Sequence, residues 1–274
     1  SKILILLERS FTMVHLAMPR EFTDHPLPRR VRDLLGEENL QDTELYFKSS
    51  NSCLRANGFL LSMCSPVLHK MIYGSFSESL TRHVDLYEVD GKAFGKVLDL
   101  WCGREDSEDN ELWDVLALGS IADRFQISEV VEMLEKVIVD QLSVGVCGDV
   151  LASSGGIGML RLEEAARRLT LDRFEEVAQT PGFGNIDEDA LGKLLDDDTL
   201  VARREEAVWE ALVAWMTADE GALRGRALLP KIRFPLMSAA YLSSKVRQSL
   251  PPEHADWVDS FVRAALLAKA GAAG

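Results

Sequence analysis

The order of apolar and polar positions divides the chain into two halves. Between residues 29 and 145, stretches with the spacing of an amphipathic helix alternate with short stretches of period two, which is the period of a strand with one buried face. Beyond Gly148 no stretch has period two, and apolar residues recur at helical spacing. The pattern predicts an α+β N-terminal half, with helices around a small, mainly antiparallel sheet, and an all-α C-terminal half.

Three short segments have the period of a strand. Leu45 and Phe47 alternate with polar neighbours, and residues 53–56 follow after the polar turn S-S-N-S, so these two segments predict a hairpin. Val84 and Leu86 alternate in the same way and predict a third strand.

Residues typical of N-caps precede several of the predicted helices. Ser65 stands before Pro66, which favours the first turn of a helix, and Asp90 stands before the next apolar helical pattern. We expect Asn110 and Ser128 to cap the two helices that follow. In the C-terminal half, helices are expected over 149–152, 162–169, 171–178, 187–195 and 203–216, with Asp187 as one cap and the run D-D-D at 196–198 capping the next helix.

The ends of the chain differ from its middle. Residues 1–28 hold a brief apolar run and three prolines, and predict an irregular, loosely attached leader. The first domain is expected at 29–145 and the second at 146–262. The alanine-rich tail at 263–274 is expected to be a frayed helix end.

Composition and charge narrow the possible partners. The chain has 274 residues, of which 47% are hydrophobic, and its formal net charge is -14. Such an acidic chain is not expected to bind nucleic acid or an anionic membrane, because both attract basic surfaces. The longest apolar runs are too short to span a bilayer. Cys53, Cys64, Cys102 and Cys147 are dispersed and predict buried free thiols. We therefore expect a soluble protein of the cytoplasm or the nucleus.

The chain contains no motif that predicts catalysis or a cofactor. Its five histidines never occur at the spacing of metal ligands, and S-S-G-G-I-G at 153–158 lacks the spacing of a phosphate-binding loop. No arrangement of a nucleophile, a base and an acid can be proposed. The sequence predicts neither a catalytic residue nor a metal or cofactor site, and we expect that the chain is not an enzyme.

The N-terminal half resembles the BTB (POZ) domain. The resemblance covers residues 42–142 and rests on D-T-E-L-Y-F from Asp42, on the phrase from Leu54 to Met71, and on V-D-G-K-A-F-G-K-V-L-D-L-W-C-G. In that family an aspartate opens the first strand, here Asp42. The family's histidine and its following basic residue are replaced by Asn57 and Gly58, although that base normally joins the aspartate in a charged pocket at the dimer interface.

The C-terminal half resembles the BACK domain that follows BTB in kelch-type adaptors. The resemblance covers residues 146–246 and is carried by L-D-D-D-T-L-V-A-R-R-E-E-A-V-W-E-A-L-V-A-W-M-T-A-D and by I-R-F-P-L at 232–236. The sequence given ends after this region, and no kelch propeller is expected within it.

The resemblance implies two interaction sites in the BTB domain. The predicted helix at 29–40 would form a homodimer interface through Val31, Leu34 and Leu35, with Asp42 beside it; alternatively, these apolar residues cover only the domain's own sheet. The family's cullin-3 motif, a hydrophobic residue and an acid separated by one position, is matched after the Ser65 helix by F-S-E, which is Phe76, Ser77 and Glu78.

The chemistry of F-S-E suits a docking site. Phe76 would anchor in a pocket of the cullin-3 N-terminal domain, and Glu78 would accept hydrogen bonds at its rim. The alternative is that Phe76 packs on its own domain and Glu78 caps the next segment.

The resemblance implies a non-enzymatic adaptor that dimerises through BTB and brings a substrate protein, which the sequence does not identify, to a cullin-3 RING ubiquitin ligase. The alternative is a scaffold or transcription-linked oligomeriser that uses the BTB domain only to dimerise and has no ligase function.

Overall fold

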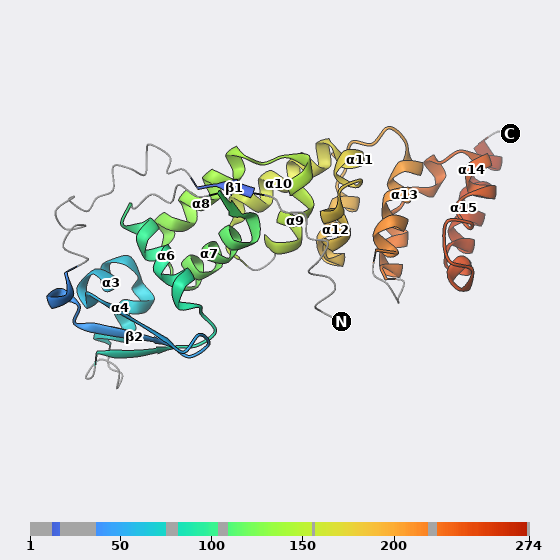
Figure 1. Ribbon diagram of the computed structural model, residues 1–274. Coiled ribbons are helices and arrows are strands. Elements are labelled where there is room, and N and C mark those ends of the chain that lie inside the picture. The colour runs from blue at the N-terminus through green and yellow to red at the C-terminus, as the bar shows by residue number, and fades with distance from the viewer. Residues whose placement is uncertain are drawn as a thin grey trace. The chain divides into compact units, whose positions relative to one another are not determined.

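The computed structural model describes residues 13–16, 37–74, 82–103, 109–154, 157–218 and 224–272. These residues form two compact units (Figure 1). The N-terminal unit lies within residues 11–141 and 156–162, and the C-terminal unit lies within 142–155 and 163–274.

The larger of the two sheets in the N-terminal unit has three strands, with β2 in the centre. β3 pairs with β2 in the antiparallel direction, which confirms the predicted hairpin, and Leu45 faces Leu54 across it. β4 pairs with the other edge of β2 in the parallel direction, so that Leu45 also faces Val84. This sheet therefore has one antiparallel and one parallel pairing, because two helices carry the chain across before β4 begins. The strands are β2 (Thr43–Phe47), β3 (Ser52–Ala56) and β4 (His83–Leu86).

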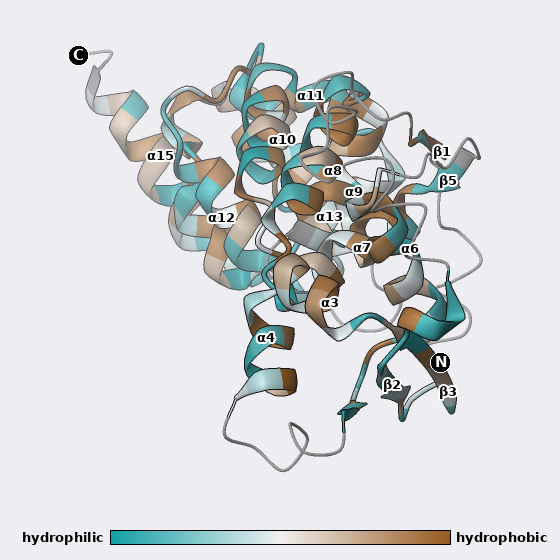
Figure 2. Ribbon diagram, turned by 90° about the vertical axis from the view of Figure 1, so that its left-hand side faces the viewer, coloured by the Kyte–Doolittle hydropathy of each residue, from teal (hydrophilic) through white to brown (hydrophobic). Residues whose placement is uncertain are grey.

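Two helices of this unit begin directly after a side chain that caps their first turn. The Ser65 hydroxyl accepts a hydrogen bond from Leu68 N at 3.1 Å, and Asp90 accepts from Lys92 N at 3.0 Å, which confirms both predicted caps. Figure 2 shows α3 coloured largely brown, in keeping with its apolar sequence. The helices are α3 (Gly58–Cys64), α4 (Pro66–Tyr73), α6 (Gly91–Trp101), α7 (Leu112–Arg124) and α8 (Ser128–Asp140), and a short 3-10 helix, η2 (Glu38–Leu40), precedes β2.

Two of the predicted caps are wrong. Asn110 lies in strand β5 (Asp109–Glu111), and its side-chain oxygen accepts from Lys96 Nζ at 2.5 Å. Ser128 is the first residue of α8 and not its cap. Glu111 and Ile127 occupy the cap positions of α7 and α8, and neither makes a side-chain cap hydrogen bond.

Part of the predicted leader is a strand of the N-terminal unit. β1 (Met13–His15) pairs with β5 in the antiparallel direction, and Val14 and Leu16 are buried. The expectation of an irregular 1–28 is therefore wrong at these positions. The rest of that segment lies outside the described residues.

Residues 157–162 complete the N-terminal unit. They contain the first turn of α10 (Leu160–Asp172), where Glu135 of α8, only 5% exposed, accepts from Arg161 N at 2.8 Å and from Leu162 N at 3.4 Å. A carboxylate at the first turn of a helix satisfies amides that have no partner within the helix.

The C-terminal unit is built from helices, and no strand occurs in its described residues. Trp209 and Trp215 are fully buried, and Asp187 caps α12 by accepting from Ala190 N at 2.8 Å, as predicted. Besides α10, the α-helices of this unit are α9 (Val144–Ser154), α11 (Phe174–Val177), α12 (Glu188–Asp196), α13 (Glu205–Met216), α14 (Ala239–Ser244) and α15 (Asp259–Ala272). The 3-10 helices are η3 (Pro181–Asn185), η4 (Arg226–Lys231), η5 (Phe234–Leu236) and η6 (Pro252–Val258).

The predicted D-D-D cap turns out differently. In the predicted tail, α15 continues to Ala272. The residue before α13 is Arg204, so none of the three aspartates caps that helix. Each of them forms an ion pair with a basic residue elsewhere in the unit. The pairs are Asp196 with Lys231, Asp197 with Arg167, and Asp198 with Arg233.

Candidate functional site

Only one of the predicted site residues lies within the described residues. Asp42 is described, whereas Val31, Leu34 and Leu35 fall in the segment 17–36, and Phe76, Ser77 and Glu78 fall in the segment 75–81; both segments lie outside the described residues. The candidate site is therefore built from Asp42 and from the residues that flank the segment 75–81.

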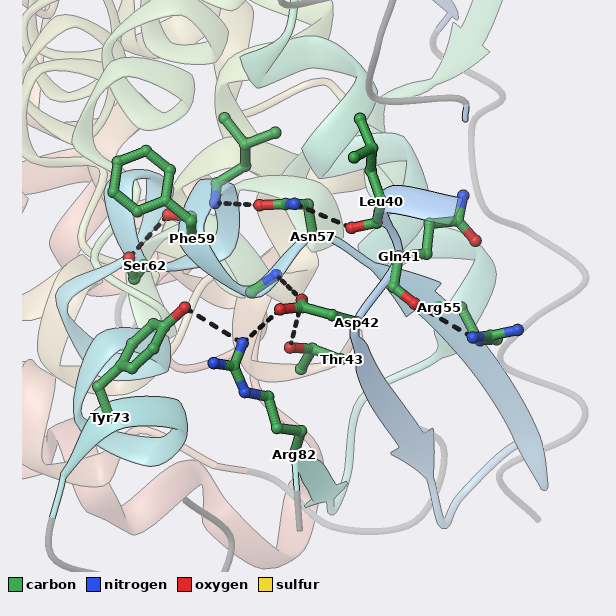
Figure 3. A network of polar contacts seen from close by, with 12 residues as sticks. Leu40, Gln41, Asp42, Thr43, Arg55, Asn57, Phe59, Ser62, Tyr73 and Arg82 are labelled. Carbon is green, nitrogen blue, oxygen red and sulfur yellow. Dashed lines mark hydrogen bonds and ion pairs between the residues drawn. The ribbon is translucent and has the colours of Figure 1, made fainter. Parts of the chain in front are cut away.

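Asp42 stands at the centre of a network of polar contacts at the start of β2 (Figure 3). Its Oδ1 accepts from Gly58 N at 2.8 Å and from Thr43 Oγ1 at 3.1 Å. Its Oδ2 forms an ion pair with Nη1 of Arg82, the residue immediately before β4. Arg82 Nη1 also lies 3.4 Å from Tyr73 Oη, at the end of α4. Three elements thus meet at one carboxylate.

The surroundings of Asp42 favour its charged form. Burial by itself raises the pKa of this carboxyl, but the hydrogen bonds from Gly58 N and the Thr43 hydroxyl, together with the charge of Arg82, outweigh it and hold the pKa below its ordinary value. The Asp42 side chain remains 48% exposed and that of Arg82 40%. The ion pair is therefore available at the surface.

Arg82 is a residue that sequence reasoning missed. The resemblance left Asp42 without its usual base, because Gly58 stands at that position. A Cβ at Gly58 would overlap with the Thr43 hydroxyl and would lie 3.2 Å from Arg82 Nη1. The parallel register, in which His83 faces Glu44, brings Arg82 beside Asp42. No pattern in the sequence gives this register, so the structure was needed to identify Arg82 as the base beside Asp42.

α3 presents an exposed apolar face next to this network. Phe59 is 63% exposed and Met63 is 51% exposed, and residues four positions apart lie on the same face of a helix. Asn57 caps α3 by accepting from Leu60 N at 3.1 Å, and donates to Leu40 O at 2.8 Å, which ties the chain before Asp42 to this helix. An exposed apolar pair beside charged residues is typical of a protein-binding surface.

A groove of about 280 Å³ lies between β3, α3 and α6. Its wall includes Leu54, Leu60 and the buried thiols of Cys64 and Cys102. Burial raises the pKa of the Cys64 thiol far above its ordinary value, so this thiol stays protonated and is a poor nucleophile. Cys53 is exposed, which corrects the prediction that all four thiols are buried.

The polar side chains of the sheet form a row of surface contacts. His83 lies between Glu44, whose Oε2 is 3.1 Å from Nδ1, and Asp85, whose Oδ1 is 3.3 Å from Nε2. Among the residues that the structure describes, no three His, Cys, Asp or Glu side chains converge as they would around a metal ion. None of the helices in the described part of the chain is long and apolar enough to cross a membrane.

Comparisons with known proteins cover both units. A family model for the BTB/POZ domain matches residues 32–142, and the model for BACK, described as BTB And C-terminal Kelch, matches residues 147–247. Similar proteins include human Kelch-like protein 41, 28% identical over 80% of this chain, and human Kelch-like protein 17, 29% identical over 77% of it. Kelch-like protein 40 of Xenopus tropicalis is 26% identical over 80%. The chain spans about a third of the length of these relatives, from 33% to 36%.

Proposed function

This chain belongs to the proteins in which a BTB/POZ domain is followed by a BACK domain, and on that premise we propose that it is a non-enzymatic adaptor. It self-associates through the BTB domain and recruits a substrate protein to a cullin-3 RING ubiquitin ligase. The observation that carries the proposal is the F-S-E motif directly after α4 of a BTB domain that BACK follows.

The described residues give this motif a defined starting point. α4 begins at the Ser65 cap and Pro66 and ends at Tyr73, three positions before Phe76. A phenylalanine side chain supplies apolar area to a partner pocket, and a carboxylate two positions later accepts hydrogen bonds at the edge. This arrangement supports docking of the cullin-3 N-terminal domain at the segment after α4.

Titration calorimetry of the whole chain against the cullin-3 N-terminal domain tests this proposal. We expect binding at micromolar concentration or tighter, and a loss of at least about 100-fold in the Phe76→Ala, Glu78→Ala double variant, since truncated hot-spot residues cost about 2 kcal/mol or more. Ser79→Ala, in the same segment but outside the motif, serves as the matched control and should bind like the wild type. No heat of binding from the wild type at tens of micromolar would overturn the proposal.

Self-association is supported by the surface around α3. The exposed pair Phe59 and Met63 lies beside the Asp42–Arg82 ion pair, and a twofold interface requires a small, self-complementary surface of this kind. Light scattering on the purified chain measures the mass directly. A dimer is expected, and a monomer at every concentration tested would exclude this part of the proposal.

The second candidate is a scaffold or transcription-linked oligomeriser without ligase function, in the cytoplasm or the nucleus. The observation that favours it is that the exposed apolar pair on α3 needs only a second copy to be covered. A dimer that does not bind the cullin-3 domain, and that copurifies from cells with a constant protein partner but no ligase component, is the result expected for this candidate.

A further inference from the structure

The groove between β3, α3 and α6 has apolar walls that remain accessible. Several of the apolar residues that line it are half-buried rather than buried, and these are Leu54, Ala56, Leu60 and Leu98. The charged residues of its described lining are Arg55 and Asp99, one of each sign, and both are exposed. The groove therefore offers apolar contact without a net charge.

Gly95 lies in the middle of α6 and lines this groove. Glycine in a helix interior is less favourable than alanine, so its presence there calls for a reason. Packing within the described part of the chain gives none, since a Cβ at Gly95 would meet nothing within 4 Å. Gly91 of the same helix differs, because a Cβ there would lie 2.4 Å from Ser52 Oγ. A position without a Cβ at the wall of a groove lets the backbone of a ligand approach closely.

The backbone hydrogen bonds of β2 define which groups of β3 are paired. Glu44 N donates to Arg82 O at 2.9 Å, so Glu44 directs its backbone groups towards β4. Because these groups alternate along a strand, Leu45 directs its own towards β3, where its partner is Leu54. Leu54 therefore uses both of its backbone polar groups on β2.

Cys53 and Arg55, on either side of Leu54, direct their backbone groups away from β2. Among the described residues, β2 is the one strand that pairs with β3, and no backbone hydrogen bond joins Cys53 or Arg55 to a further element. The Arg55 side chain is held at the edge, since Nη2 donates to Gln41 O at 3.1 Å (Figure 3). A strand edge with unpaired N–H and C=O groups is a template for another strand.

We propose that this edge and the groove beside it bind an extended segment of a partner protein, which adds to β3 as a further strand of the sheet. The backbone of the segment pairs with Cys53 and Arg55, and its alternate side chains, which are apolar and uncharged, enter the groove. The surface consists of residues of β3, α3 and α6 and not of the F-S-E motif. The inference therefore goes beyond the proposed function and does not depend on it.

Selection of short random peptides displayed on phage, with the whole chain as the target, tests this proposal. We expect the enriched peptides to carry apolar residues at alternate positions, and to bind the wild type when synthesised and titrated by calorimetry. Gly95→Leu places a side chain in the groove and should weaken this binding about 10-fold or more, without lowering the melting temperature. Lys92→Leu adds the same side chain at an exposed position of α6 outside the groove, and should bind like the wild type.

A pair of variants at Arg55 tests the strand pairing itself. Arg55→Pro removes the outward N–H, a change that an edge strand tolerates, whereas Arg55→Ala removes the side chain and keeps the N–H. Arg55→Pro should bind the peptides about 10-fold more weakly than Arg55→Ala. If Arg55→Pro unfolds, N-methylation of alternate backbone amides of the peptide supplies the test, because it removes donors of the peptide and leaves the protein unchanged.

The possible results are distinguishable. A selection that yields no peptide able to bind the wild type would overturn the inference. So would peptides that bind Gly95→Leu as tightly as the wild type, or that bind Arg55→Pro and Arg55→Ala equally. A lower mass of Gly95→Leu in light scattering would assign the groove to a second copy of the chain and would also overturn it. If the wild type binds the peptides but not cullin-3, the inference stands and only the proposed function fails.

Discussion

Gln141 pairs with both backbone polar atoms of His15. Its Oε1 accepts from His15 N at 3.0 Å, and its Nε2 donates to His15 O at 2.9 Å. The side-chain amide therefore takes the place of a neighbouring strand along the open edge of β1. A short strand far from its partner in the sequence is thus held from both sides, by β5 and by the end of α8.

Removal of this amide should release β1. In Gln141→Ala, we expect the amides of 13–16 to exchange about 5-fold faster or more, because two hydrogen bonds worth about 1 kcal/mol each are lost. Hydrogen exchange followed by mass spectrometry measures this. Gln179→Ala, an exposed glutamine of the C-terminal unit, is the control, and equal protection of 13–16 in both variants would show that the amide does not hold β1.

Two glycines of α9 should respond in opposite ways to alanine. A Cβ at Gly148 would lie 2.5 Å from backbone atoms of Gly182 and Phe183, which cannot move aside easily, whereas a Cβ at Gly145 meets nothing within 4 Å. We expect Gly148→Ala to lower the free energy of unfolding by about 1–3 kcal/mol or more, and Gly145→Ala to raise it by up to about 1 kcal/mol through helix propensity. Chemical denaturation compares the pair, and equal stabilities would contradict the close packing of α9 on η3.

Glu135 should contribute to stability through the backbone of α10. Glu135→Ala leaves Arg161 N and Leu162 N without their acceptor, and we expect a loss of about 1–3 kcal/mol in the free energy of unfolding. Glu135→Gln keeps an acceptor oxygen and should lose less. Glu132→Ala, at an exposed position of the same helix, is the control and should change the free energy of unfolding little. If Glu132→Ala were as destabilising as Glu135→Ala, the loss would come from α8 itself and not from the hydrogen bonds to α10.

Asp197 should make stability depend on pH in the acidic range. Hydrogen bonds from the hydroxyl and the backbone N–H of Thr199, together with the Arg167 guanidinium, lower the pKa of Asp197 from 3.8 to about 2. A carboxyl whose pKa is lower in the folded state than in the unfolded state stabilises the fold at pH values above its unfolded-state pKa. This stabilisation is lost as the pH falls through the folded-state pKa. Asp197→Asn should therefore be less stable than the wild type above about pH 4, and the difference should shrink towards pH 2. Thermal unfolding across this range measures it, with Asp256→Asn as the control; a difference that does not vary with pH would exclude the ionised carboxylate as its cause.

The exposed pair on α3 should matter for self-association and not for folding. In the double variant Phe59→Glu, Met63→Glu, the mass from light scattering should shift towards that of a monomer, because charge is placed in the centre of an apolar surface. The melting temperature should stay nearly unchanged, because both side chains are exposed. Tyr87→Glu alters another exposed aromatic residue and should leave the mass unchanged. If the wild type forms the proposed dimer and the double variant has the same mass, this face is excluded as the interface.

Local signals in the sequence predicted the elements that local chemistry determines. The alternation of Leu45 and Phe47 identified β2, and the hydroxyl of Ser65 and the carboxylate of Asp90 marked two helix starts, because each of these features acts within a few residues. The BTB and BACK order was likewise readable from phrases of the sequence, and the family models match both.

The predictions that were wrong, and the residue that was missed, share a different cause, which is contact between distant parts of the chain. Asn110 is a strand residue because β1 pairs with it from far along the chain, and Asp197 is an ion-pair partner because α10 brings Arg167 beside it. Arg82 reaches Asp42 only through the parallel register of β4. A pattern within one segment cannot report a partner that the tertiary fold supplies, so the polar residues of the candidate site needed the structure.

The parallel pairing of β2 and β4 bears on the order in which this sheet forms. β2 and β3 are joined by a short turn, so their pairing closes a small loop, whereas β4 can join β2 only after α3, α4 and the segment 75–81 have been brought round. Contacts between residues distant in the chain form slowly because the loop entropy must be overcome first. We expect the hairpin to form early and β4 to dock late, so that the Asp42–Arg82 ion pair is completed among the last contacts of the domain. The same edge would then be the first to open in the folded protein.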